Sequence, residues 1–62
     1  MNKDEISIHL CRVLALLDSG RPFSARKYVD LILYSLELKH SHKEVLESAK
    51  IMGLYDEQKK AV

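Results

Sequence analysis

Apolar residues recur at three- and four-residue intervals over two long stretches of the chain. In residues 3–18 the main apolar stripe consists of Ile6, Leu10, Val13, Leu14 and Leu17. In residues 25–39 it consists of Ala25, Tyr28, Val29, Ile32 and Leu36, with Leu33 at its edge. This spacing follows the 3.6-residue period of a helix rather than the alternation of a strand. It predicts two α-helices and argues against a strand at 28–38.

Capping residues predict where the first and third helices begin. Asn2 with Glu5, and Ser41 with Glu44, have the spacing of capping boxes, in which the two side chains satisfy each other's free backbone N–H groups. The first helix is expected over 3–18, and a third over 42–52.

Ser24 is the expected N-cap of the second helix, with Phe23 and Tyr28 at the spacing of a hydrophobic staple. Gly20–Pro22 separates the first two helices, because glycine favours the left-handed end of a helix and proline cannot continue one. Gly53 should stop the third helix, with Leu54 folding back onto it.

The predicted fold is therefore all-α, a compact three-helix domain made of a helical hairpin and a short third helix. Residues 1–54 form this single domain. Residues 55–62 are expected to be a short tail, either frayed or forming one extra helical turn.

Both long helices carry apolar residues on more than one side. The first has a second stripe of Ile8, Cys11 and Ala15, and its polar strip of Glu5, His9 and Arg12 is interrupted by Leu16. The second helix carries Leu31, Tyr34 and Leu38 away from its main face. Three short helices cannot cover all these sides, so we expect a homodimer with the second helix near its centre. The candidate dimer or protein-interaction surface is Leu16, Leu31, Tyr34 and Leu38.

Composition limits the partners and the compartment. The 62 residues carry 10 Lys and Arg against 9 Asp and Glu, so the formal net charge of +1 gives no strong attraction to nucleic acid or lipid. The only cysteine, Cys11, fits a reducing compartment. The acidic start and the short apolar runs do not resemble a signal peptide or a membrane span. We expect a cytoplasmic protein with no membrane contact.

No residue pattern indicates catalysis, a metal or a cofactor. His9 and Cys11 are two apart on a helix and point about 200° from each other, so they cannot converge on one ion. His40 and His42 are expected to be solvated loop histidines, and Cys11 a small buried thiol. Three short helices also leave little room for a pocket. The expected protein is not an enzyme.

Two features suggest nucleic acid or an anion as an alternative ligand. Arg21, Arg26 and Lys27 gather near the start of the second helix, where free N–H groups also attract anions. Pairing of Arg26 and Lys27 with Asp30 explains the same charges more simply. Residues 49–54 resemble the middle of a helix-turn-helix, although the charged residues that follow suit a recognition helix poorly.

The favoured function is a small protein-binding regulator, adaptor or inhibitor that acts through an apolar helical surface without catalysis. The alternative is a nucleic-acid-binding regulator that uses the basic residues or a degenerate helix-turn-helix. The sequence does not separate a surface that holds the homodimer from one that binds a different protein.

Overall fold

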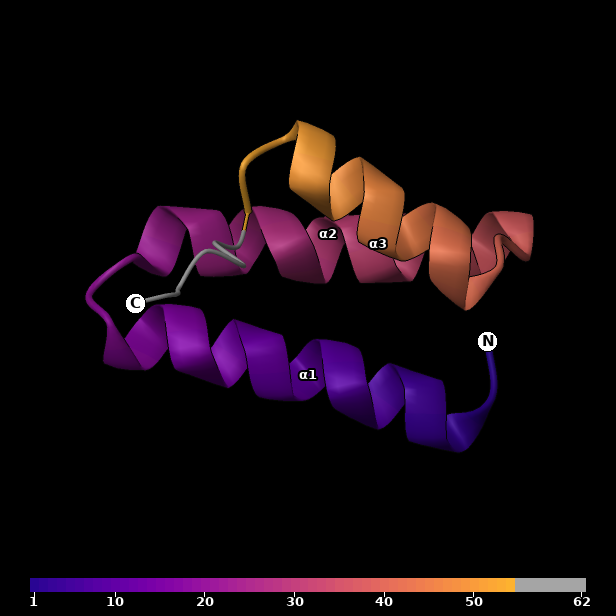
Figure 1. The fold of residues 1–62 in the computed structure, drawn as a ribbon, viewed down its shortest axis with the longest axis horizontal. Coiled ribbons are helices and arrows are strands. Elements are labelled where there is room, and N and C mark those ends of the chain that lie inside the picture. Colours follow the sequence, from indigo (N-terminus) through magenta and orange to yellow (C-terminus); the bar gives the residue numbers. More distant parts are fainter. Residues whose placement is uncertain (55–62) are drawn as a thin grey trace, which may run out of the picture.

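The computed structural model describes residues 1–54, which form three helices and no strand (Figure 1). α1 (Lys3–Asp18) and α2 (Pro22–Leu38) lie antiparallel as a hairpin, and α3 (His42–Ile51) packs across α2. The all-α, three-helix prediction is confirmed, as is the argument against a strand at 28–38. None of these helices is long and apolar enough to cross a membrane. The prediction for residues 55–62 lies outside the described part of the chain.

Both predicted capping boxes are present. The backbone N–H of Glu5 donates to Asn2 Oδ1 at 2.8 Å, and the backbone N–H of Asn2 donates to Glu5 Oε1 at 2.9 Å. Ser41 and Glu44 repeat the pattern at 3.2 and 2.8 Å. The hydrogen bond that the backbone N–H of Ser41 donates to the Glu44 carboxylate, together with a contribution from the Ser41 side chain, holds the pKa of Glu44 below its ordinary value. The starts of α1 and α3 are therefore fixed by local side chains.

The predicted start of α2 is wrong. The helix begins at Pro22, and Arg21 is its N-cap without a side-chain hydrogen bond. Proline is well suited to the first helical position, because its fixed φ matches the helix and the N–H that it lacks would have no helical partner there. Phe23 is 82% exposed, so it makes no hydrophobic staple. Arg26 consequently lies beyond the first turn, where the helix dipole penalises positive charge little.

All three helices end in the same way, with one residue in the left-handed region. These residues are Gly20 (φ 77°), Lys39 (φ 59°) and Gly53 (φ 69°). In each case the N–H of the following residue reaches back to a carbonyl five residues earlier: Arg21 to Leu16 at 2.9 Å, His40 to Ser35 at 2.8 Å and Leu54 to Ala49 at 2.9 Å. This is the Schellman arrangement. It confirms Gly53 as the stop of α3 and Leu54 as the apolar residue that folds back.

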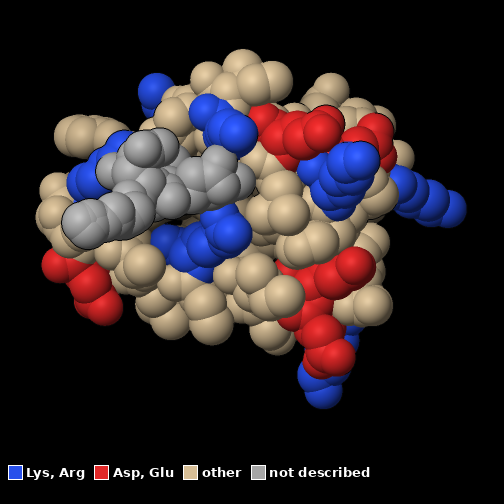
Figure 2. Space-filling view, in the orientation of Figure 1, with Lys and Arg blue, Asp and Glu red and all other residues tan. Residues whose placement is uncertain are grey.

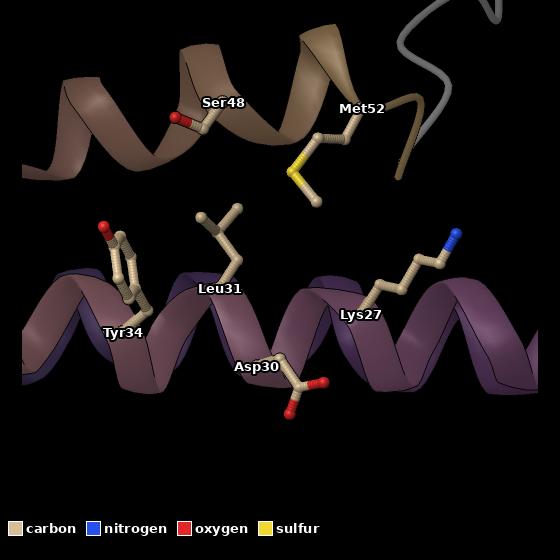
Figure 3. A pocket seen from close by; sticks show the side chains of 6 residues that line it. All are labelled: Lys27, Asp30, Leu31, Tyr34, Ser48 and Met52. Carbon is tan, nitrogen blue, oxygen red and sulfur yellow. The ribbon is translucent and has the colours of Figure 1, made fainter.

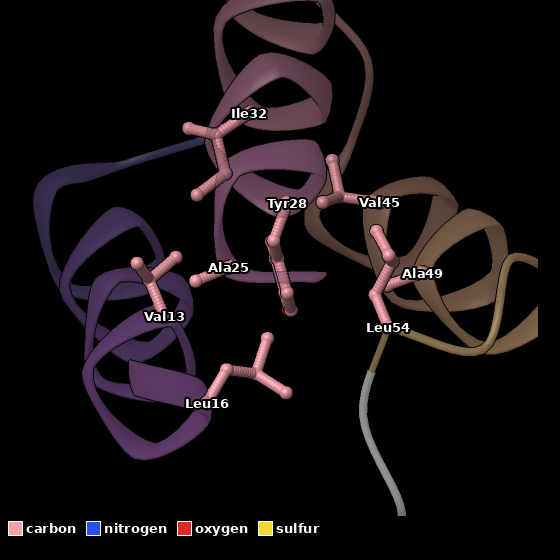
Figure 4. Packing of buried hydrophobic residues seen from close by; sticks show 8 residues of the cluster. All are labelled: Val13, Leu16, Ala25, Tyr28, Ile32, Val45, Ala49 and Leu54. Atoms are coloured by element: carbon pink, nitrogen blue, oxygen red, sulfur yellow. The ribbon is translucent and has the colours of Figure 1, made fainter. Parts of the chain in front are cut away.

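The core lies where the three helices meet (Figure 4). Its buried apolar residues are Val13 and Leu16 from α1, Ala25, Tyr28 and Ile32 from α2, Val45 and Ala49 from α3, and Leu54. Leu54 closes the core from beyond the end of α3. The core is small, and the burial of each large side chain contributes roughly 1.5–3 kcal/mol before entropic costs.

The buried face of α1 is rotated from the predicted one, and Val13 is the member of the predicted main stripe that lies in the core. The strip that begins with Glu5 and runs through His9 to Leu16 points inward, whereas Leu10 and Leu14 on the predicted main face are exposed. This strip can enter the core because the ring nitrogens of His9 find hydrogen-bond partners there. The predicted face of α2 is confirmed for Ala25, Tyr28 and Ile32, while Leu33 and Leu36 remain exposed.

Candidate protein-binding site

A groove of about 660 Å³ runs between α2 and α3 (Figure 3). It is lined by Lys27, Asp30, Leu31 and Tyr34 from α2, and by Ser48 and Met52 from α3. In Figure 3 the side chains of Leu31 and Tyr34 rise from α2 towards α3, and Met52 reaches down from α3. The groove is open to solvent, since Tyr34 and Met52 are both exposed.

Helical spacing places these side chains in one row. Lys27, Leu31 and Tyr34 follow at intervals of four and three residues, beside the buried face of α2. Ser48 and Met52 are one turn apart on α3. α3 contacts α2 along the line of Val45 and Ala49, and the row beside this contact is left open. The expectation that three short helices leave little room for a pocket is therefore wrong for this open groove.

The groove has an apolar floor and polar edges. Leu31 is half-buried and packs against the core, so the floor is held by the rest of the fold. The ring of His40 meets the ring of Tyr34 edge-on, with centroids 6.0 Å apart, and helps to orient it. Lys27 and Asp30 place opposite charges on the α2 side of the groove. Such a surface suits the binding of an apolar side chain whose neighbours are polar.

A buried hydrogen-bonded chain joins all three helices through the core residue Tyr28. His9 Nδ1 lies 2.7 Å from the hydroxyl of Tyr28, and His9 Nε2 lies 2.9 Å from His42 Nδ1. Burial lowers the pKa of His9 to about 4, and the charges of His42 and Arg12 act in the same direction. His9 has no exposed surface, so this chain holds the helices together and does not face a ligand.

Two predictions about these candidate ligands need correction. His42 is half-buried and bonded to His9, so it is not a solvated loop residue. Cys11 is exposed, because it lies about 200° from His9 around the α1 axis and so faces away from the core. Within residues 1–54 no three His, Cys, Asp or Glu side chains are close enough to hold a metal ion.

The structure separates the four residues of the predicted interaction surface. Leu16 belongs to the core, with 4% of its surface exposed, so it is not available to a partner. Leu31 and Tyr34 line the groove. Leu38 is exposed near the end of α2, outside the groove lining. The lining residues that sequence reasoning missed, Ser48 and Met52, are on α3, whose exposed faces gave no strong apolar pattern.

The basic residues near the start of α2 do not form one patch. The guanidinium of Arg21 donates to the backbone carbonyl of Gly53 at 3.1 Å and so ties α2 to the end of α3. Lys27 belongs to the groove, and Arg26 lies about 100° away around the helix. On the face shown in Figure 2, Lys and Arg atoms occur on both halves, and Asp and Glu atoms lie mainly beside those on the right.

The resemblance of residues 49–54 to a helix-turn-helix has a structural explanation. Ala49 and Leu54 are core residues, and Gly53 ends α3 with a positive φ. The second helix of such a motif would fall in residues 55–62, outside the described part of the chain.

Comparison with known protein families, with characterised proteins and with solved structures finds no match for this chain.

Proposed function

We propose that this protein is a small, non-catalytic regulator or adaptor of the cytoplasm, that it is a homodimer, and that it binds another protein in the groove between α2 and α3. The observation that carries this proposal is the open groove, with its apolar floor at Leu31 and its exposed aromatic wall at Tyr34. Large apolar and aromatic side chains of this kind are the usual anchors of protein interfaces.

The ligand that fits this groove best is an amphipathic helix of the partner. Leu31 and Met52 face each other across the groove and can receive apolar side chains spaced one turn apart. The hydroxyl of Tyr34 and the ammonium group of Lys27 lie on the same row of α2, where they can bond polar groups at the edge of that helix. The opposite charges of Lys27 and Asp30 favour a partner helix that carries both positive and negative side chains along its polar edge.

A photo-crosslinking experiment tests this proposal directly. A photoreactive phenylalanine analogue at position 34, inside the groove, is compared with the same analogue at Lys43, which is exposed on α3. In extract of the native host, position 34 should yield a discrete adduct with one protein that position 43 does not. Met52→Glu should reduce the yield at position 34 at least tenfold, roughly, because a charge on an apolar wall must be desolvated.

Three results would overturn the proposal: no adduct at position 34, the same adducts at both positions, or an adduct that survives Met52→Glu unchanged. A nuclease-sensitive adduct would instead favour the alternative of nucleic-acid binding. The contacts of the basic residues favour protein binding over that alternative, because Arg21 donates to the carbonyl of Gly53 and Lys27 lines the groove.

A further inference from the structure

The α1–α2 hairpin carries a second apolar surface, which we call the hairpin patch. It consists of five exposed leucines, Leu10, Leu14, Leu17, Leu33 and Leu36, which are each 38–60% exposed. Val29, beside these leucines on α2, is half-buried and packs against the core, and Ile6 on α1 is also half-buried. Sequence patterning assigned all of these residues to the buried main faces of the two helices, yet the structure leaves the leucines in contact with solvent.

On α1 the patch lies on one flank of the buried face. Successive residues of a helix are rotated by about 100° around its axis. Measured around the axis of α1, Leu10 and Leu17 therefore lie about 80–100° from His9, and Leu14 lies about 140° from it. All three are displaced in the same rotational sense. His9 marks the centre of the buried face of this helix.

On α2 the patch lies on the matching flank. Leu36 and Leu33 lie about 80° and 140° from the buried Tyr28, in the same sense as on α1. Because the two helices are antiparallel, flanks of the same rotational sense lie on the same side of the hairpin. The opposite flank of α2 carries Leu31 and faces α3 across the groove. The leucines of both helices therefore form one surface on the side of the hairpin away from α3.

We infer that a second copy of this chain covers the hairpin patch, packing α1 and α2 of one subunit against α1 and α2 of the other. This inference rests on the proposal that the protein is a homodimer, and it assigns the surface that holds the dimer. The groove between α2 and α3 then remains free for a different protein.

The size of the hairpin patch supports a second copy. Five leucines at these exposures present on the order of 400–500 Å² of apolar surface, which lies in the middle of the range of roughly 300–600 Å² for the largest patch on a monomer, a patch that is often functional. Each side of a standard interface buries roughly 800 Å² with an apolar centre and a polar rim, so the patch is large enough to form the apolar centre of such an interface. A chain of 62 residues is also in the size range in which a subunit interface commonly supplements a small core.

Charges around the hairpin patch favour a copy of the same chain over an unrelated partner. On α1 the exposed rim carries Lys3 at one end and Asp18 at the other. On α2 it carries Arg26 near the hairpin turn and Glu37 near the far end. A two-fold axis parallel to the helices brings Lys3 over Glu37 and Asp18 near Arg26 of the second copy. A two-fold axis perpendicular to the helices and in the plane of the patch instead brings Lys3 of one copy near Asp18 of the other, and Arg26 of one copy near Glu37 of the other. The rim is therefore self-complementary in either arrangement.

Sedimentation equilibrium over a wide range of concentration tests this assignment. The wild type should be a dimer, and Leu33→Glu should raise the dissociation constant at least 100-fold, roughly, because it places a charge in an apolar interface. Leu14→Glu should have the same effect from the other helix. Ile51→Glu is the matched control, since Ile51 is 86% exposed at the end of α3 and outside the patch. It should leave the dimer unchanged.

Several outcomes separate this inference from the proposed function. A wild type that stays monomeric at several hundred micromolar overturns both the homodimer and the patch assignment. A dimer that survives both Leu33→Glu and Leu14→Glu overturns the patch assignment alone and leaves the proposed binding in the groove standing. If that dimer is lost in Tyr34→Glu, the dimer contact lies in the groove, and both the patch assignment and the binding of a different protein there are overturned. If the leucine variants fail to fold, the wild-type melting temperature decides the question: it must rise with protein concentration in a dimer, and an unchanged temperature overturns the inference.

Discussion

The imidazole of His9 and the hydroxyl of Tyr28 meet in the centre of the protein, with 2.7 Å between Nδ1 and the phenolic oxygen. Neither residue has exposed surface. His42 Nδ1 lies 2.9 Å from the other ring nitrogen of His9, so one short chain connects α1, α2 and α3. A neutral imidazole donates with one nitrogen and accepts with the other, which matches these two neighbours. If His9 and His42 were both protonated, two N–H groups would face each other at this distance.

Acid should weaken the fold through His9. Its pKa is about 4 in the folded protein and near the ordinary value of 6.5 after unfolding, so the unfolded chain binds the proton more readily. This contribution to stability is complete above pH 6.5, is lost as the pH falls from 6.5 to 4, and does not change further below pH 4 on account of this residue. The expected loss is about 3 kcal/mol. Urea unfolding at intervals between pH 7.5 and pH 4, monitored by circular dichroism, measures it.

A histidine variant isolates this contribution. His9→Gln places its amide near the position of Nε2, where it can hydrogen-bond His42, but it cannot titrate, so its stability should change much less between pH 6.5 and 4. His40→Gln, at the loop between α2 and α3, is the control and should keep the wild-type pH dependence. A His9→Gln protein that loses as much stability as the wild type in this interval would show that other groups cause the acid sensitivity.

The residues with left-handed backbone at the helix ends predict two substitutions with opposite effects on stability. Lys39 adopts φ 59° at the end of α2, in a position where α1 and α3 have glycine. A side chain costs roughly 1 kcal/mol in this conformation, so Lys39→Gly should stabilise the protein by about 0.5–1 kcal/mol. Gly53→Ala should destabilise it by about 1 kcal/mol, and only through the backbone, because an added Cβ would meet nothing within 4 Å. Thermal and urea unfolding of both variants should show the opposite signs.

Helix capping gives a matched pair of serine substitutions. Ser41→Ala removes the oxygen that accepts from the Glu44 N–H at 3.2 Å, and it should cost about 1 kcal/mol of stability. Ser24→Ala should change stability by less than about 0.5 kcal/mol, because Ser24 lies inside α2 and caps no helix. Urea unfolding at pH 7 compares the two. A larger cost for Ser24→Ala would indicate that α2 begins at Ser24 in solution, contrary to the start at Pro22.

Local signals were sufficient to predict the helices. Capping boxes and positive-φ glycines act within a few residues, so the bounds of α1 and α3 follow from the sequence almost unchanged. The start of α2 was misplaced because two local signals compete there. Ser24 is a good capping residue, but Pro22 is already suited to the first turn, and the helix includes both.

The buried faces of the helices and the candidate site could not be predicted without knowing which residues are neighbours in space. His9 appeared to belong to a polar strip, and it is buried only because Tyr28 and His42 from two other helices satisfy its nitrogens. Once this strip turns inward, Leu10 and Leu14 must turn outward, since one rotation of α1 sets every residue on it. Leu31 and Tyr34 were correctly picked out as apolar residues away from the main face of α2. Their groove was not predictable, because its second wall comes from α3.

The buried hydroxyl of Ser35 provides the last test, because no hydrogen bond in the described structure offsets the cost of its burial. The residue has no exposed surface, and its oxygen has no hydrogen-bond partner in the described structure. Folding removes water from this hydroxyl and replaces none of the lost hydrogen bonds, which is unfavourable. Alanine is also the better helix former. Ser35→Ala should therefore stabilise the protein by about 1–1.5 kcal/mol in urea unfolding.

Ser7→Ala is the control for this prediction. Ser7 is exposed on α1 and donates to the carbonyl of Lys3 at 3.0 Å, so this variant should gain only the helix propensity of about 0.5 kcal/mol. A Ser35→Ala protein less stable than the wild type would show that the hydroxyl is satisfied in solution, as by an internal water, and contributes to the fold.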